Sequence, residues 1–354
     1  MSTSKRPVVE PTVSVLLDPG WAADSLVADV RRGLGAHPRT LPPKWLYDDH
    51  GSDLFDQITR LPEYYPTEAE RALLVAHADE IVTLSGADTV VELGSGTSDK
   101  TRTLLDAFTA HGTLERFVPV DVSESTLRTA AAELATRYPG LRVEAIVGDF
   151  TLHLGHLPSG GRKIVAFLGG TIGNLYVEER AAFLGALADS LEPGDCVLLG
   201  TDLVKASDRL IAAYNDSQGV TAAFVTNCLY VVNRELGADF DPAAFSYVPF
   251  WDPHMERMDL RLRSEMPQRV KIPGVKVPGA NVDGANVDGA NVDGANVDGA
   301  DLEIDLASGE EIRVEISTKF RPDQLRAELA AAGFDLEQLW SDADFALTLA
   351  RRAG

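Results

Sequence analysis

Apolar and polar residues alternate in blocks through the middle of the chain. Short apolar runs, each followed by a turn and then by residues with helical spacing, occupy residues 90–93, 117–120, 143–147, 164–168 and 196–200. Runs of this length bounded by turns are typical of strands buried on both faces of a sheet. Because helices separate the strands, the pattern predicts an α/β fold with a doubly wound sheet.

The two ends of the chain follow other patterns. Residues 1–20 are rich in Pro, Ser and Val, and we expect them to be disordered. Near the carboxyl end, a helical pattern that begins at Phe320 precedes apolar runs at residues 336–340 and 345–350. These two runs predict an antiparallel hairpin at the edge of the same sheet.

Three loops in the first seventy residues carry aromatic side chains and are stiffened by Pro or Gly. They include Trp45, Phe55 and Tyr64. Such loops are typical of a pocket wall, because loops held on a rigid scaffold carry binding residues. The alternative is that the rings pack the core of a small helical subdomain.

The first central run ends in the sequence Glu-Leu-Gly-Ser-Gly-Thr-Ser at residues 92–98. Ligands of open α/β sheets bind beyond the carboxyl ends of the strands, and glycines such as Gly94 let backbone N–H groups approach a ligand. A dinucleotide loop needs a third glycine where this chain has Asp99, so the match to NAD is poor. A loop that binds S-adenosylmethionine (SAM) fits better, and an ordinary strand-to-helix turn is the alternative.

Acidic residues follow the next two strands. Asp121 ends the second run, at the spacing from Gly94 that places a carboxylate beside the ribose hydroxyls of an adenosine cofactor. Asp149 and Phe150 end the third run and suit the amino group and the face of an adenine base. The fourth run leads into residues 169–174, where we expect Asn174 to face the reacting centre.

Net charge and cysteine content limit the kinds of molecule that this protein is expected to bind. The chain has 354 residues and a formal net charge of -22, so it repels nucleic acid unless a basic patch is hidden in the fold. Its two cysteines, Cys196 and Cys228, lack metal-ligand spacing and favour buried thiols in a reducing compartment. With neither a signal-peptide pattern nor a membrane-length apolar stretch, we expect a cytoplasmic protein that binds a small molecule and no metal.

Several motifs together resemble a known family. Besides the loop at residues 92–98, they include Leu-Pro-Pro-Lys-Trp-Leu-Tyr-Asp, Leu-Pro-Glu-Tyr-Tyr-Pro-Thr, Gly-Asp-Phe, Gly-Gly-Thr-Ile-Gly-Asn-Leu, Gly-Thr-Asp-Leu-Val-Lys and Lys-Phe-Arg-Pro. Their order closely resembles the actinobacterial L-histidine Nα-methyltransferases of ergothioneine biosynthesis, from about residue 21 to the end. The resemblance implies SAM-dependent trimethylation of L-histidine to hercynine.

The resemblance also implies a class I SAM-dependent methyltransferase domain joined to an α+β substrate-binding domain. We expect residues 69–204 and 317–354 to form the first domain, and residues 21–68 and 205–316 to form the second. We expect the protein to be a monomer.

The resemblance further implies the site residues. The expected cofactor contacts are Gly94, Lys100, Asp121, Asp149 and Phe150. The expected substrate contacts are Tyr47 beside the amine, Phe55 and Gly169 shaping the pocket, Asn174 and Tyr214 on the carboxylate, and Tyr64, Glu315 and Ser317 on the imidazole. Tyr47 and Asn174 are the expected catalytic residues.

Elementary chemistry agrees with these roles. Methyl transfer needs a neutral amine aligned with the methyl carbon, and tyrosine faces tolerate a growing cation by cation–π attraction. An acid and a hydroxyl suit the two nitrogens of an imidazole. From the residues alone, however, Glu315 and Ser317 read as the polar face of an edge strand, since Val314 and Ile316 alternate with them.

Two features depart from the family pattern. Leu260 stands where some relatives have methionine, and only a small adjustment of shape is expected. Residues 279–303 contain the repeat Gly-Ala-Asn-Val-Asp, which is too short for a stacked β-helix and lacks a calcium pattern. We expect a flexible extension of a hairpin, with the risk that it shifts the register of the strand carrying Glu315.

Two other functions stay open. A methyltransferase of the same family acting on a tryptophan derivative would need an apolar replacement of Glu315 and Ser317. A non-catalytic SAM-binding scaffold would be favoured by loss of Tyr47, Asn174 or Tyr214, and all of these residues are present.

Overall fold

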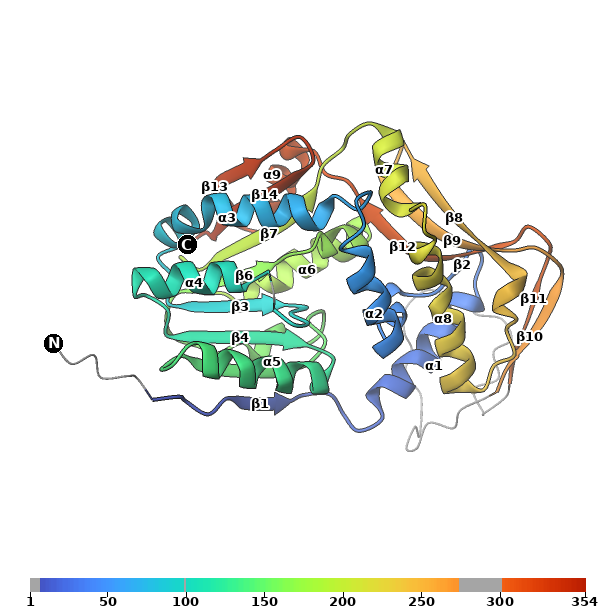
Figure 1. Ribbon diagram of the computed structural model, residues 1–354, viewed down its shortest axis with the longest axis horizontal. Helices are drawn as coiled ribbons and strands as arrows, with labels where there is room; N and C mark the ends of the chain where they lie inside the picture. Colours follow the sequence, from blue (N-terminus) through green and yellow to red (C-terminus); the bar gives the residue numbers. More distant parts are fainter. Residues whose placement is uncertain (1–6, 99, 274–300) are drawn as a thin grey trace.

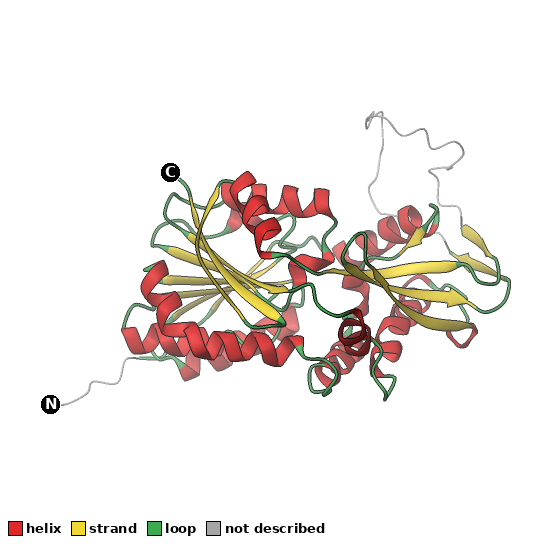
Figure 2. Cartoon of the chain, turned by 90° about the horizontal axis from the view of Figure 1, so that it is seen from above, coloured by secondary structure: helices red, strands yellow, loops and turns green. Residues whose placement is uncertain are grey.

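A computed structural model describes residues 7–98, 100–273 and 301–354. Figure 2 shows two sheets side by side, each with its own helices. The larger sheet has eight strands, in the order β1 (Thr12–Val15), β5 (Arg142–Val147), β4 (Arg116–Asp121), β3 (Thr89–Leu93), β6 (Lys163–Phe167), β7 (Cys196–Asp202), β14 (Phe345–Arg352) and β13 (Phe334–Ser341). β14 runs antiparallel to β7 and to β13, whereas the strands from β1 to β7 are parallel.

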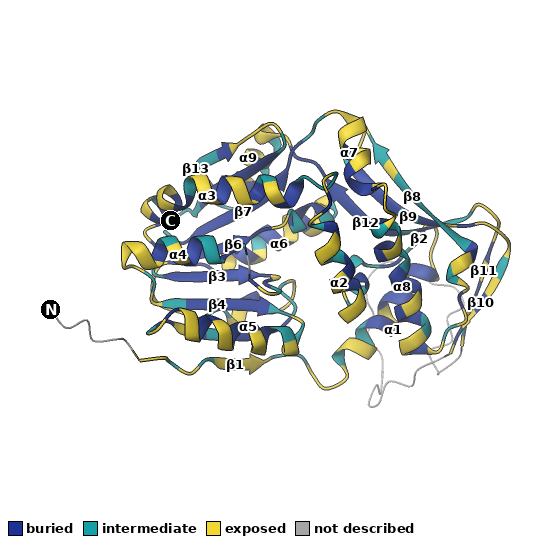
Figure 3. Ribbon diagram, in the orientation of Figure 1, coloured by how far each residue is buried: buried dark blue, intermediate teal, exposed yellow. Residues whose placement is uncertain are grey.

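Helices cover both faces of this sheet (Figure 1). On one face lie α3 (Pro66–Ser85), α4 (Arg102–His111) and α5 (Glu124–Arg137), which share a core with Val90 and Leu198. On the other lie α6 (Val177–Asp189) and α9 (Pro322–Ala331), with Val91 and Leu199. Neighbouring strand residues thus enter opposite cores, and this is why β3, β6 and β7 are buried throughout (Figure 3). The predicted doubly wound α/β fold and its closing hairpin are confirmed.

The prediction that residues 1–20 are disordered is wrong for part of that range. Residues Thr12–Val15 form β1, which pairs in parallel with β5, and the Leu16 N–H donates to Val147 O at 2.9 Å. β1 occupies the backbone groups that β5 would otherwise leave open at the sheet edge. Four residues are too few for a periodic signal, so the sequence pattern missed this strand.

The smaller sheet has the strand order β2 (Arg39–Thr40), β12 (Glu311–Thr318), β9 (Arg257–Ser264) and β8 (Phe245–Asp252). One apolar core joins it to α1 (Trp21–Leu34), α2 (Asp49–Ile58), α7 (Ser207–Tyr214) and α8 (Val220–Leu236). Elements from the amino-terminal segment and from the segment after β7 therefore form one α+β unit. The exact domain boundaries given above stay a prediction.

The predicted hairpin at the repeat is present as β10 (Gln268–Ile272) and β11 (Leu302–Leu306), which pair antiparallel. The repeat itself, and with it the expectation that it is flexible, lies outside the described residues. Four 3-10 helices complete the described elements: η1 (Pro43–Leu46), η2 (Leu154–His156), η3 (Thr171–Asn174) and η4 (Pro242–Ala244). Across the residues that the structure describes, none of the helices has the length and apolarity needed to cross a membrane.

Candidate active site

The predicted cofactor residues meet at one edge of the larger sheet. The strand order reverses between β3 and β6, and open α/β sheets bind their ligands beyond the carboxyl ends of the strands at such a point. After β3, Gly94 and Gly96 have φ of 67° and 49°, a left-handed conformation that favours glycine. Asp121, at the end of β4, accepts the Gly96 N–H at 2.9 Å and the Ser123 N–H at 2.9 Å. The carboxylate thus holds the glycine loop in place.

The end of β5 closes the same edge. The Phe150 ring packs edge-on against Phe167, 5.1 Å between centroids, and lies 3.8 Å from the place a Cβ on Gly94 would take. Asp149 accepts the Thr151 N–H at 2.8 Å through Oδ1. Gly94, Asp121, Asp149 and Phe150 are therefore brought together, as predicted.

This edge fits a polar, adenosine-bearing ligand. The Ser95 hydroxyl is buried and has no hydrogen-bond partner among the described residues, and the space where a Gly96 Cβ would stand is open. A buried hydroxyl without a partner is costly unless a ligand meets it. No group of three or more His, Cys, Asp or Glu side chains that could hold a metal occurs within the described ranges.

Lys100 is tied to the next loop by a residue that the sequence did not indicate. Glu70 of α3 is fully buried and accepts from Lys100 Nζ at 2.6 Å and from the Gly169 N–H at 2.7 Å. Gly200 leaves room for this carboxylate, since a Cβ there would lie 1.9 Å from Glu70 Oε1. Lys100 and Gly169, predicted on cofactor and substrate, are thus held by one carboxylate.

A row of aromatic rings leads from this edge into the smaller unit. The Tyr47 ring is edge-on to Phe55 at 5.4 Å and to Phe224 at 5.1 Å. Phe55 lies 6.4 Å from Tyr64, which lies 6.1 Å from Tyr214. These rings come from α2, α7, α8 and the loops that follow η1 and α2, and they include the predicted Phe55 and Tyr64 but not Trp45. All except Tyr47 also belong to the apolar core or pack against it, so the core-packing alternative holds for them as well.

Glu315 and Ser317 lie on β12, which pairs with β2 only at Ile312 and Arg313 and with β9 also at Glu315 and Ser317. Their exposed fractions are 9% and 6%. A bulge between Arg313 and Glu315 puts Glu315 opposite Leu260 of β9, so Leu260 does neighbour the pocket. Because both side chains are buried, the alternative that they form a solvent-facing polar surface of an edge strand is wrong. Ser317 Oγ lies 2.8 Å from the Tyr214 hydroxyl.

Charge and burial set the protonation of this pocket. Burial raises the pKa of Glu315 to about 7, although Lys319 opposes the shift. Burial is also the main cause that raises the pKa of Tyr47, Tyr64 and Tyr214 well above the ordinary value, and the charge of Glu315 adds to it. These phenols therefore stay protonated. Because the charge of Glu315 acts on all three phenols, Tyr47, Tyr64 and Tyr214 lie near Glu315.

Tyr47 and Asn174 come from the two different units. Tyr47 keeps 42% of its surface exposed, so part of its ring faces open space. Asn174 ends η3, which packs against β12, because Gly173 lies so close that a Cβ there would be 2.8 Å from Thr318 O. Gly173 thus brings Asn174 next to the strand that carries Ser317.

Several residues of the pocket were missed by the sequence analysis. Tyr247 of β8 donates to Tyr214 O at 2.7 Å, and the fully buried Lys319 contacts Tyr214, Ser317 and Asp202. Glu315, Ser317 and Lys319 alternate along the chain, and this period of two was the available signal.

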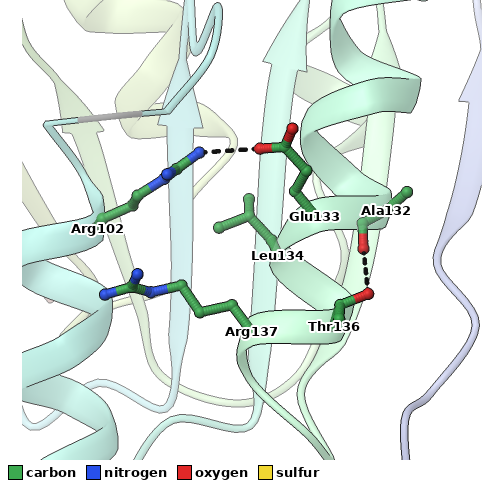
Figure 4. Close-up of a pocket in the computed structure, with 6 residues that line it drawn as sticks. All are labelled: Arg102, Ala132, Glu133, Leu134, Thr136 and Arg137. Carbon is green, nitrogen blue, oxygen red and sulfur yellow. Dashed lines mark hydrogen bonds and ion pairs between the residues drawn. The ribbon is translucent and has the colours of Figure 1, made fainter.

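A separate surface pocket lies between α4 and α5 (Figure 4). It is lined by Arg102, Ala132, Glu133, Leu134, Thr136 and Arg137. Arg102 donates to Glu133 at 3.2 Å across it. None of the predicted site residues lines this pocket, and it plays no part in the site.

The strand order with an antiparallel β14, together with acids that follow β4 and β5 around a glycine loop, defines a class I SAM-dependent methyltransferase. The chain belongs to the family of histidine-specific, SAM-dependent methyltransferases, whose model matches residues 26–352. The predicted family, enzyme class and cofactor are thereby confirmed.

Individual proteins are similar over much of the chain. A histidine N-alpha-methyltransferase of Mycolicibacterium smegmatis is 51% identical over 94% of this chain and 96% of its own. Ergothioneine biosynthesis protein 1 of Neurospora crassa is 34% identical over 56% of this chain and 23% of its own. The solved structure of human N-acetylserotonin methyltransferase with SAM has a TM-score of 0.40 and 14% identity, over 95% of this chain and 68% of that one. The fold assignment rests on the sheet order and the family match.

Proposed function

We propose that this enzyme transfers three methyl groups from SAM to the α-amino nitrogen of L-histidine, giving hercynine in the first step of ergothioneine biosynthesis. The observation that carries the proposal is the buried pair Glu315 and Ser317, in electrostatic and hydrogen-bond contact with Tyr214 and Tyr64. A buried acid is costly unless a partner meets it, and the Ser317 hydroxyl, already bonded to Tyr214 and Lys319, can make one more hydrogen bond. An imidazole has one nitrogen for each of the two side chains.

The carboxyl edge of the larger sheet would hold the cofactor. Asp121 would accept from the ribose hydroxyls, and Asp149 and Phe150 would take the adenine. Gly94 would allow the close approach of the loop, and Lys100 would meet the carboxylate end. When bound, SAM supplies a methyl group on a sulfonium, and the C–S bond breaks as the N–C bond forms.

The pocket would orient histidine by its three polar groups. Asn174 and Tyr214 would donate to the α-carboxylate, and Tyr47 would lie beside the amine. Tyr64, Glu315 and Ser317 would hold the imidazole, with Phe55 and Gly169 shaping the wall. Because Asn174 and Gly169 follow β6, the amine end would lie toward the cofactor edge and the ring would lie away from it.

Tyr47 would orient the amine rather than deprotonate it. Its raised pKa keeps the phenol protonated near neutral pH, so its oxygen offers only lone pairs to an amine N–H. The open side of Tyr47 leaves a path to water for the proton that each transfer releases. Faces of Tyr47, Phe55 and Phe224 would stabilise the growing ammonium, at ~1 to 2 kcal/mol each when desolvated.

Further parts of the proposal concern the whole protein. The domains would be residues 69–204 with 317–354 for SAM, and 21–68 with 205–316 for histidine. The protein would act as a monomer in the cytoplasm, where its two free, buried thiols stay reduced.

Product mass spectrometry tests the proposal. The purified protein is incubated with SAM and a panel of amino acids that includes histidine, tryptophan and partly methylated histidines. We expect up to three methyl groups on histidine alone. Methylation of tryptophan in preference to histidine would favour the related-substrate alternative, and SAM binding without methylation of any amino acid would favour the scaffold alternative.

A further inference from the structure

A buried lysine stands behind the proposed substrate pocket. Lys319 follows β12 directly and has an exposed fraction of 0%. Its Nζ lies 2.9 Å from Asp202 Oδ2, 2.8 Å from the Tyr214 hydroxyl and 2.7 Å from Ser317 Oγ. An ammonium group has three N–H donors, so these partners satisfy it completely. Nothing in the proposed reaction has so far used this charge.

The cluster around Lys319 carries excess positive charge. Asp202, which ends β7, is also paired with the ammonium of Lys205 and accepts from the Tyr65 hydroxyl at 2.9 Å. The ammonium groups of Lys205 and Lys319 share the carboxylate of Asp202, so these three side chains together have a formal charge of +1, without counting the neighbouring Glu315. Lys205 and Asp202 are almost fully buried as well, so water screens this charge little. The excess charge reaches the pocket through Tyr214 and Ser317.

Lys319 also fixes what the two hydroxyls can offer. It donates to both oxygens, and only one of the two hydroxyl hydrogens can lie in the 2.8 Å contact between Tyr214 and Ser317. The other hydrogen is left for the pocket. When Ser317 donates to Tyr214, the Tyr214 hydrogen is free for a carboxylate, and Ser317 keeps a lone pair for a ring N–H.

We propose that Lys319 is a positioning residue that makes the pocket specific for a free α-carboxylate, by placing a buried positive charge behind Tyr214 and by orienting the Tyr214 hydroxyl as a donor. This inference rests on the proposed function. Lys319 would thus make the enzyme prefer a free amino acid to a carboxyl-blocked one without touching the substrate itself. Glu315, two positions before Ser317 on β12, would meet the ring, so the carboxylate and the imidazole of histidine would each have their own partner.

The test compares L-histidine with L-histidinamide, which has the same ring and amine but no carboxylate. We measure kcat and KM for both with SAM, in the wild type and in Lys319→Met. We expect kcat/KM for histidine to fall by roughly 30-fold or more, mostly through KM, because hydrogen bonds with a charged group are the strong ones. We expect less than about a threefold change for histidinamide. Comparing the same two substrates in both proteins cancels the difference between their amine pKa values.

Lys163 provides the matched control. It is also buried and ion-paired, with Nζ 2.9 Å from Asp195 Oδ2, at the amino end of β6 and so at the opposite edge of the sheet. Lys163→Met should lower the melting temperature without changing the ratio of kcat/KM for histidine to that for histidinamide. Lys319→Gln, which keeps polar atoms at the position, carries the same prediction if Lys319→Met does not fold.

The outcomes separate cleanly. A large fall in the preference for histidine, confined to the Lys319 variants, supports the inference. An equal fall for both substrates, or an unchanged preference, overturns it while leaving the proposed function intact. A wild type that methylates neither compound overturns the proposed function itself.

Discussion

The two halves of the site are built in different ways. The proposed cofactor half comes from three successive strand-and-helix units between Gly94 and Phe150, and its side chains lie at matching ends of β3, β4 and β5. The proposed substrate half collects Tyr47, Tyr214 and Glu315 from segments that lie far apart in the chain. A contiguous site can be read from spacing along the sequence, whereas a scattered one depends on tertiary packing.

The halves also differ in how they treat charge. Asp121 is held by backbone N–H groups, which favour the ionised carboxylate. Glu315 is buried in the pocket, and the pKa raised to about 7 shows that its charged form is disfavoured there. The substrate half therefore sacrifices stability for selectivity, as functional sites commonly do. The predictions below separate the two halves.

The largest expected effect is on the imidazole contact. Glu315→Gln should lower kcat/KM for histidine by a factor on the order of hundreds, because a site built to hydrogen-bond its substrate loses most when one partner is changed. The KM for SAM should stay within about twofold. Steady-state kinetics with each substrate varied in turn measures both values.

Glu311→Gln is the control on the same strand. Glu311 pairs with Arg261 and Arg263, away from the pocket, and ion pairs of this partly exposed kind contribute little. Its kinetics should be nearly those of the wild type. Equal losses in Glu311→Gln and Glu315→Gln would mean that the strand as a whole, and not the Glu315 carboxylate, sets the activity.

The reverse effect is expected at the cofactor edge. Asp121→Asn should weaken SAM binding by about 10- to 100-fold, since it removes a charged acceptor from ribose and from the glycine loop. Calorimetric titration with SAM measures this directly, and Asp106→Asn on the exposed side of α4 serves as the control. Unchanged affinity would contradict the role given to Asp121.

A smaller effect is expected where η3, which follows β6 of the larger sheet, packs against β12 of the smaller sheet. Gly173→Ala would push η3 away from Thr318 and displace Asn174, so kcat/KM for histidine should fall by roughly tenfold. Gly185→Ala on α6, where a Cβ meets nothing within 4 Å, should leave kinetics unchanged. If the two alanine variants behave alike, the close approach of η3 to β12 is irrelevant to the site.

The smallest effect is on stability and depends on pH. The pKa of Glu315 is raised in the folded state, so the folded protein binds more protons than the unfolded one and stability falls as pH rises from about 4.5 to about 7. Glu315→Gln lacks this loss, which amounts to at most about 3 kcal/mol. Melting curves without ligands should show the variant gaining a few °C on the wild type between pH 5 and pH 8. A pH-independent difference would mean that Glu315 is not buried as a charge.

The sequence predicted the secondary structure correctly wherever one continuous apolar run forms one helix or strand. Strands β3 to β7, α9 and the closing hairpin follow from apolar runs, because strands buried on both faces have continuous apolar sequences. β1 was missed because its alternating pattern is only four residues long, and just Val13 of these residues packs against the core of the sheet.

The candidate site was predicted less evenly. Gly94, Asp121 and Asp149 follow from strand ends, whereas the substrate residues were assigned only through resemblance to a family. Glu70 and Lys319 escaped because their partners, Gly169 and Tyr214, are about a hundred residues away. At Glu315 the alternation of polar and apolar residues was misleading, because residues 314–318 of β12 are buried on both faces of the strand. A bulge between Arg313 and Glu315 also shifts the pairing with β9 there.

The orientation of histidine across the two halves is the central claim, and the position of the new methyl groups tests it most directly. Histidine is converted with SAM carrying a ¹³C-labelled methyl group, and the product is examined by NMR. The account predicts that every labelled methyl resides on the α-nitrogen, because Asn174 would hold the carboxylate, and Tyr47 the amine, toward the cofactor edge. Label on a ring nitrogen would mean that the imidazole faces the cofactor, which would contradict the placement of Glu315 and Ser317.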